Sequence, residues 1–116
     1  MTVSSGLAFT PLAAFPTYNG TKAFIHQFSE SLRLQLADST ISVIELVPPA
    51  VQTELVAGGS TNEHYLPLDD FADEVMSLLE TQPDATEILV ENVKFLRFAE
   101  VEGRYDAAIS AINQFA

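Results

Sequence analysis

Tyr18 and Lys22 are the two residues of this 116-residue sequence whose types and spacing most directly offer chemistry. They stand four positions apart, and on a helix that spacing places two side chains on one face, one turn apart. An ammonium group beside a phenol favours the phenolate form of the phenol. A tyrosine in that environment can give or take a proton near neutral pH, so the pair predicts general acid–base chemistry.

The helix that must carry this pair is expected over residues 17–37. Pro16 stands at its expected first turn, where proline is tolerated because the missing N–H would have no partner there. The apolar residues of this helix recur every four positions, at Phe24, Phe28, Leu32 and Leu36. We interpret this apolar stripe as core packing or a helix–helix interface rather than as a cofactor contact.

The other predicted elements alternate between strands and helices, which indicates an α/β fold. A nearly apolar strand at residues 41–47 is expected to be covered on both faces in a parallel sheet. Two short helices at 94–102 and 104–114 are expected on either side of Gly103, a typical residue after a helix end. The remaining elements are a strand at 2–4, a polar, mobile loop at 50–67, a helix at 69–81 and a strand at 87–90.

Composition excludes several classes of function. The net charge of -11 argues against nucleic acid and anionic membrane surfaces as partners, and only five Lys and Arg are present to build a local anion site. The absence of cysteine excludes disulfides, thiolate metal sites and a cysteine nucleophile. The opening has no basic signal-peptide region, and no run approaches the roughly 20 apolar residues of a membrane span. We therefore expect a cytoplasmic protein.

Residues 18–22 resemble the YxxxK signature of the short-chain dehydrogenases/reductases. Residues 3–6 resemble the strand end that carries the catalytic serine of this family, and Ser5 lies at the usual interval before Tyr18. Residues 48–53 are similar to the PGxxxT segment that holds the nicotinamide end of the cofactor, although Pro49 replaces the usual glycine. That double proline and the sequence after it resemble a bacterial and fungal subgroup related to DltE-type oxidoreductases.

The resemblance implies a role for each matching residue. Tyr18 would exchange a proton with a carbonyl or alcohol oxygen, Lys22 would assist it and bind the nicotinamide ribose, and Ser5 would hold the substrate oxygen. The cofactor would be NADP or NAD, and the substrate a small carbonyl compound or alcohol. The cofactor-binding residues implied are Tyr18, Lys22, Pro48, Val51 and Thr53.

Simpler interpretations stand beside these roles. Tyr18 could be a packed helix tyrosine, and the choice of Ser5 over Ser4 depends on spacing alone. Thr53 could cap the turn that follows it, a role compatible with cofactor binding. His26 and His64 stand apart from each other and from any carboxylate cluster, so we interpret them as surface or partly buried histidines and expect no metal site.

The resemblance also implies the extent of the fold. Residues 1–116 would form a single partial Rossmann-like domain, the C-terminal half of a doubly wound parallel sheet with about three strands and flanking helices. The N-terminal βαβ half would be absent, because the five glycines form no phosphate-binding turn after a strand. The strand at residues 2–4 would then have an unpaired, apolar edge that is prone to pairing with another chain.

Two functional hypotheses follow. In the first, the chain is the catalytic half of an NAD(P)(H)-dependent oxidoreductase and is inactive until a cofactor-binding half is supplied. In the second, it is a truncated, non-catalytic remnant that acts as an oligomerisation or interaction module. The helix at 17–37 suits both, because the corresponding family helix packs in the four-helix bundle of a dimer, and a homo-oligomer is expected.

Overall fold

The computed structural model describes residues 1–114 and centres on a parallel sheet of three strands in the order β1-β2-β3. The strands are β1 (Thr2–Val3), β2 (Glu45–Leu46) and β3 (Glu87–Ile88). Their register aligns Thr2 with Glu45 and Glu45 with Glu87. The predicted partial Rossmann-like α/β fold is thereby confirmed.

The strands are shorter than predicted. Only Glu45 and Leu46 of the expected strand at 41–47 pair as a strand with both neighbours. Pro48 and Pro49 have no N–H with which to continue the ladder at the carboxyl end. At the amino end, residues 41–43 lie before the residues that pair with β1, so they are not part of the strand.

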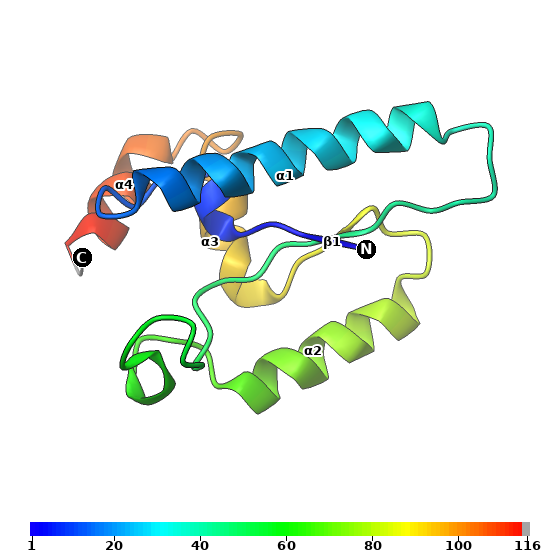
Figure 1. The fold of residues 1–116 in the computed structure, drawn as a ribbon. Coiled ribbons are helices and arrows are strands. Elements are labelled where there is room, and N and C mark those ends of the chain that lie inside the picture. The colour runs from blue at the N-terminus through cyan, green and yellow to red at the C-terminus, as the bar shows by residue number, and fades with distance from the viewer. Residues whose placement is uncertain (115–116) are drawn as a thin grey trace.

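Two long helices lie on opposite sides of the sheet, α1 (Pro16–Gln35) above it and α2 (Leu68–Thr81) below it in Figure 1. Both were predicted with nearly these bounds. The remaining helices are α3 (Lys94–Arg97) and α4 (Tyr105–Asn113), and the 3₁₀ turns are η1 (Gly6–Ala8), η2 (Gly59–Thr61) and η3 (Glu91–Val93). No helix within residues 1–114 is both long and apolar enough to cross a membrane.

The prediction of a helix over 94–102 was wrong at its end. Helix α3 ends at Arg97, and turns follow. The chain then reverses at Gly103, whose φ of 76° lies in the left-handed region that favours glycine. The Arg104 N–H closes the reversal by donating to the Ala99 carbonyl at 2.7 Å. The predicted break at Gly103 is therefore present, although the helix before it is shorter.

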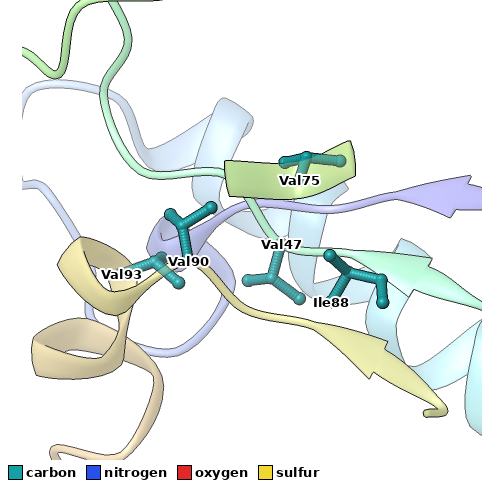
Figure 2. Packing of buried hydrophobic residues seen from close by; sticks show 5 residues of the cluster. All are labelled: Val47, Val75, Ile88, Val90 and Val93. Atoms are coloured by element: carbon teal, nitrogen blue, oxygen red, sulfur yellow. The ribbon is translucent and has the colours of Figure 1, made fainter. Parts of the chain in front are cut away.

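The apolar core lies largely between the sheet and α2. Figure 2 shows Val75 of α2 over Val47, which directly follows β2, and Ile88 of β3. Fully buried valine and isoleucine side chains of this kind each contribute about 1.5–3 kcal/mol by leaving water. The members of the cluster are Val47, Val75, Ile88, Val90 and Val93.

The apolar stripe of α1 does not pack in this core. Phe24 is 67% exposed and Phe28 is 48% exposed, and their rings stack on each other with centroids 5.9 Å apart. The core interpretation is therefore wrong for these two residues, and the helix–helix interface remains as the alternative. Helix α1 instead turns polar residues, His26 and Ser29 among them, toward the sheet.

The loop at residues 50–67 is closed at its base. Val51 and Leu66 form an isolated parallel bridge, and the Gln52 side chain donates to the Asn62 carbonyl at 2.9 Å. Gly59 is needed inside this loop, because a Cβ there would lie 2.5 Å from the Thr53 carbonyl oxygen. The loop therefore has a compact internal structure of its own.

Candidate functional site

The carboxyl ends of β1 and β2 bring two of the predicted site segments together. Ser5 follows β1 and Pro48 follows β2, and the Gly6 N–H donates to the Pro48 carbonyl at 3.0 Å. In open α/β sheets, ligands bind outside this end of the strands. The sheet therefore places the predicted serine beside the predicted nicotinamide-binding segment.

Close packing against Val93 and Leu96 requires glycine at position 6, directly after Ser5. A Cβ on Gly6 would lie 2.8 Å from Leu96 Cδ1 and 3.0 Å from Val93 Cγ2. Its φ is not among the positive values, so space rather than turn geometry demands glycine. The glycine lets η3 and α3 pack directly behind the Ser5 turn.

Helix α1 supplies the predicted acid–base pair. The Lys22 Nζ atom lies 5.5 Å from the centroid of the Tyr18 ring, as the four-residue spacing predicts. The same Nζ donates to the Val3 carbonyl of β1 at 3.3 Å. Lys22 therefore links the tyrosine to the strand that leads into Ser5.

Lys22 differs from the other cationic side chains. Within residues 1–114 it alone among the five Lys and Arg forms no ion pair with a carboxylate. The other four pairs are Arg33–Glu30, Lys94–Glu91, Arg97–Glu87 and Arg104–Glu102. In a chain with a net charge of -11, this leaves one ammonium group available, next to Tyr18.

Ser4 and Ser5 are both buried but have different partners. The Ser4 hydroxyl donates to the Glu45 carboxylate at 2.6 Å. The Ser5 Oγ accepts from the Leu7 N–H at 3.1 Å and caps η1, which leaves its hydroxyl hydrogen available for another oxygen. The hydrogen bonding thus favours Ser5 as the residue that can hold a substrate oxygen. Ser5 makes this contact within its own turn and not with Tyr18.

The segment predicted to bind nicotinamide has backbone and hydroxyl groups without a partner in the described chain. The bridge to Leu66 uses the Ala50 carbonyl and the Gln52 N–H, so the N–H and carbonyl of Val51 point the other way. The Thr53 Oγ1 accepts from the Leu55 N–H at 3.3 Å, the capping role considered for it, and keeps its hydrogen for donation. These groups fit the amide of a nicotinamide, which needs both donors and acceptors.

Sequence reasoning missed a polar cluster between α1 and the sheet. The His26 Nδ1 lies 2.9 Å from Glu45 Oε1 and 3.8 Å from Glu87 Oε1, so the interpretation of His26 as isolated from carboxylates was wrong. Glu45 has no exposed surface. A signal was available, because each of these glutamates is the only charged residue in an otherwise apolar strand segment.

The carboxylates of this cluster already have hydrogen-bonding partners: Glu45 contacts His26 and Ser4, and Glu87 contacts Arg97. The Arg97 Nε lies 3.0 Å from Glu87 Oε1, and its guanidinium group also lies 4.1 Å from the centroid of the Phe9 ring. Although the ligand atoms of His26, Glu45 and Glu87 lie within 4.8 Å of one another, a metal ion there would have to displace Arg97 or share Glu87 with it. We interpret the cluster as a structural contact that holds α1 and α3 against β2 and β3.

Glu54, near the start of the loop at residues 50–67, has a lowered pKa. The Ser60 hydroxyl donates to the Glu54 carboxylate and lowers the pKa of Glu54 below its usual value. Backbone N–H groups of Gly58 and Ser60 act in the same direction. Glu54 is exposed, so this interaction organises the loop locally and does not create a catalytic acid.

The family profile described as short chain dehydrogenase matches residues 1–64, which is more than half of the sequence. The chain belongs to this family. The match includes Ser5, Tyr18, Lys22 and the 48–53 segment, the residues whose geometry is given above. No solved structure gives a significant match to the chain.

Two curated relatives are similar to this family member. It is 57% identical over 53 residues to the uncharacterized oxidoreductase DltE of Bacillus subtilis, a stretch covering 46% of this chain and 21% of the relative. It is 34% identical over 91 residues to an uncharacterized oxidoreductase of Myxococcus xanthus, which covers 78% of this chain and 31% of the relative. The matched segment thus spans between about a fifth and a third of each relative's length.

Proposed function

We propose that this chain is the catalytic half of an NAD(P)(H)-dependent oxidoreductase that interconverts carbonyl compounds and alcohols, with Tyr18 as the general acid and base. The observation that carries the proposal is the Tyr18–Lys22 pair. The ammonium group lies 5.5 Å from the ring centroid and has no carboxylate partner within residues 1–114. Its charge is therefore available to the phenol and to a ligand.

The other residues supply binding and orientation. Ser5 holds the substrate oxygen through its available hydroxyl hydrogen, because its Oγ already accepts from Leu7. The backbone of Val51 and the hydroxyl of Thr53 hold the carboxamide of the nicotinamide, and Pro48 fixes the start of that segment beside Gly6. The cofactor supplies the hydride, which no side chain of this chain can provide.

The choice between NAD and NADP depends on groups that recognise the adenosine half of the cofactor. Residues 1–116 contain no Gly-rich turn between a strand and a helix that could bind the pyrophosphate. We expect the isolated chain to show no saturable NADPH binding below about 1 mM. Isothermal titration calorimetry tests this expectation, and a micromolar dissociation constant would mean that the chain alone holds the cofactor.

A second candidate function is homo-oligomerisation through α1 without turnover, in the cytoplasm. It is favoured by the exposed, mutually stacked rings of Phe24 and Phe28. Replacing both by serine should lower the average mass measured by sedimentation velocity. Leu34→Ser is a matched control, because Leu34 is exposed on the same helix and lies outside the four-residue stripe. An unchanged mass in the double variant would remove α1 as the interface.

A further inference from the structure

The loop over residues 9–15 leads from the Ser5 turn to the start of α1, where Tyr18 lies, and Figure 1 shows it beside α4. Pro11 has no N–H and interrupts regular structure at this point. The next residue, Leu12, is partly buried. Backbone N–H and carbonyl groups that leave water need hydrogen-bonding partners, so this loop requires partners from outside a strand or helix ladder.

Two asparagine side chains on different helices supply these partners. On α1, the Asn19 Nδ2 donates to the Leu12 carbonyl at 2.9 Å, and its Oδ1 accepts from the Leu12 N–H at 3.4 Å. On α4, the Asn113 Nδ2 donates to the Pro11 carbonyl at 3.2 Å, and its Oδ1 accepts from the Ala13 N–H at 2.8 Å. A primary amide offers a donor and an acceptor together, so each asparagine holds the loop through both.

The residue before this segment is also fixed. Thr10 has no exposed surface, its hydroxyl donates to the Leu96 carbonyl at 2.8 Å, and its N–H donates to the Gly6 carbonyl at 3.2 Å. Asn19 differs from these other anchors because it belongs to α1 and directly follows Tyr18. It therefore ties the start of the helix that carries the phenol to the loop that comes from the serine turn.

We propose that Asn19 is a positioning residue: by holding Leu12, it fixes the start of α1, and with it the Tyr18 ring, relative to Ser5. This inference rests on the proposed function, in which Ser5 and Tyr18 meet the same substrate oxygen. A displacement of about 1 Å between reacting groups can lower a rate by about 10²-fold. Asn19 acts through the loop and contacts neither substrate nor cofactor.

The test measures the motion of the Tyr18 ring in the full chain by carbon NMR relaxation. Asn19→Ala removes both bonds to Leu12, although alanine is a better helix former than asparagine. If Asn19 served only the helix, the Tyr18 ring would stay as ordered or become more ordered. The positioning role instead predicts a lower order parameter for the ring and about fivefold faster hydrogen exchange at the Leu12 amide.

A second variant and a matched control accompany this measurement. Asn19→Asp keeps an acceptor for the Leu12 N–H but lacks the donor to the Leu12 carbonyl, so it should also increase the motion of the Tyr18 ring. Negative charge near the start of a helix is favourable, so this variant serves as the folded comparison if Asn19→Ala does not fold. In the control, Asn62→Ala removes an acceptor of the His64 N–H and should leave the Tyr18 ring unchanged.

Turnover gives an independent readout when residues 1–116 are joined to the cofactor-binding N-terminal half of a family member. Asn19→Ala should lower kcat about tenfold and leave the cofactor dissociation constant nearly unchanged. The alanine variant is neutral, so this loss cannot come from a charge placed beside Tyr18. An inactive fused protein with Asn19 intact would count against the proposed function alone, because the motion of the Tyr18 ring still decides the positioning role.

Three results would overturn the proposal. The first is a Tyr18 ring that is as ordered in both Asn19 variants as in the unmodified chain. The second is an equal change of the ring in Asn62→Ala, which would make the effect a general loss of order. The third is full turnover of the fused Asn19→Ala protein, which would show that the contact with Leu12 holds the loop without positioning the reacting group.

Discussion

The Nδ1 atom of His26 lies 2.9 Å from Oε1 of Glu45, a carboxylate with no exposed surface. This contact joins the helix that carries Tyr18 and Lys22 to the central strand of the sheet. The Ser4 hydroxyl donates to the other carboxylate oxygen at 2.6 Å. The position of α1 over the sheet, and with it the position of the proposed acid–base pair, therefore depends on a buried glutamate.

Glu45→Ala should strongly destabilise the fold. The change leaves His26 and Ser4 without their buried partner and leaves a cavity under α1. Removing one member of a buried polar pair typically costs about 3–5 kcal/mol, measurable by urea denaturation. Glu54→Ala is the control, since Glu54 is exposed and should leave the urea midpoint close to that of the unmodified chain. Equal effects would mean that the cluster does not hold α1.

Two glycine substitutions should have opposite effects on stability. Gly6→Ala forces a methyl group against Leu96 and Val93 and should cost about 1–3 kcal/mol. Gly20 lies within α1 and has open space where a Cβ would stand, so Gly20→Ala should stabilise the chain by about 0.5–1 kcal/mol. Thermal unfolding of the two variants checks both signs. A stabilising Gly6→Ala would contradict the close packing behind Ser5.

Asn113→Ala should loosen the loop that separates Ser5 from Tyr18. The Asn113 side chain accepts from the Ala13 N–H at 2.8 Å and donates to the Pro11 carbonyl at 3.2 Å, so it fastens α4 to this loop. We expect faster hydrogen exchange at the Ala13 amide and a loss of about 1–3 kcal/mol. Gln114→Ala alters an exposed neighbour and should leave this amide as protected as in the unmodified chain.

The titration of Glu54 should depend on Ser60. The Ser60 hydroxyl bond lowers the pKa of Glu54, so the ionised carboxylate is favoured in the folded loop. Its small stabilising effect is present above the usual glutamate range and is lost as the pH falls through the lowered pKa. In Ser60→Ala, carbon-detected NMR should show the Glu54 pKa moving up toward its ordinary value. An unchanged midpoint would exclude this hydrogen bond as the cause.

The elements that position the site were predictable because local signals determine them. The start of α1 follows from Pro16, and the Tyr18–Lys22 proximity follows from helical spacing. The family followed from motifs at fixed intervals in the sequence. The break at Gly103 followed from its place between two helical patterns, although α3 ends earlier, at Arg97.

Apart from the end of the helix predicted over 94–102, the errors arose where partners are distant in sequence. The register that aligns Glu45 with Glu87 under His26 depends on strand pairing, which no local pattern reveals. The exposure of Phe24 and Phe28 could not be inferred, because a four-residue apolar stripe predicts burial without saying against what. The contact between Lys22 and the Val3 carbonyl likewise depends on how α1 crosses β1.

The central claim is that Tyr18 transfers the proton, and one measurement tests it most directly. Residues 1–116 are joined to the Gly-rich, cofactor-binding N-terminal half of a family member, and NAD(P)H-dependent reduction of a carbonyl panel is followed. Tyr18→Phe should lower turnover by about 10²–10⁴-fold while the cofactor dissociation constant stays nearly unchanged. Tyr105→Phe, on α4, should retain turnover. Full turnover in Tyr18→Phe would contradict the account and remove Tyr18 from the mechanism.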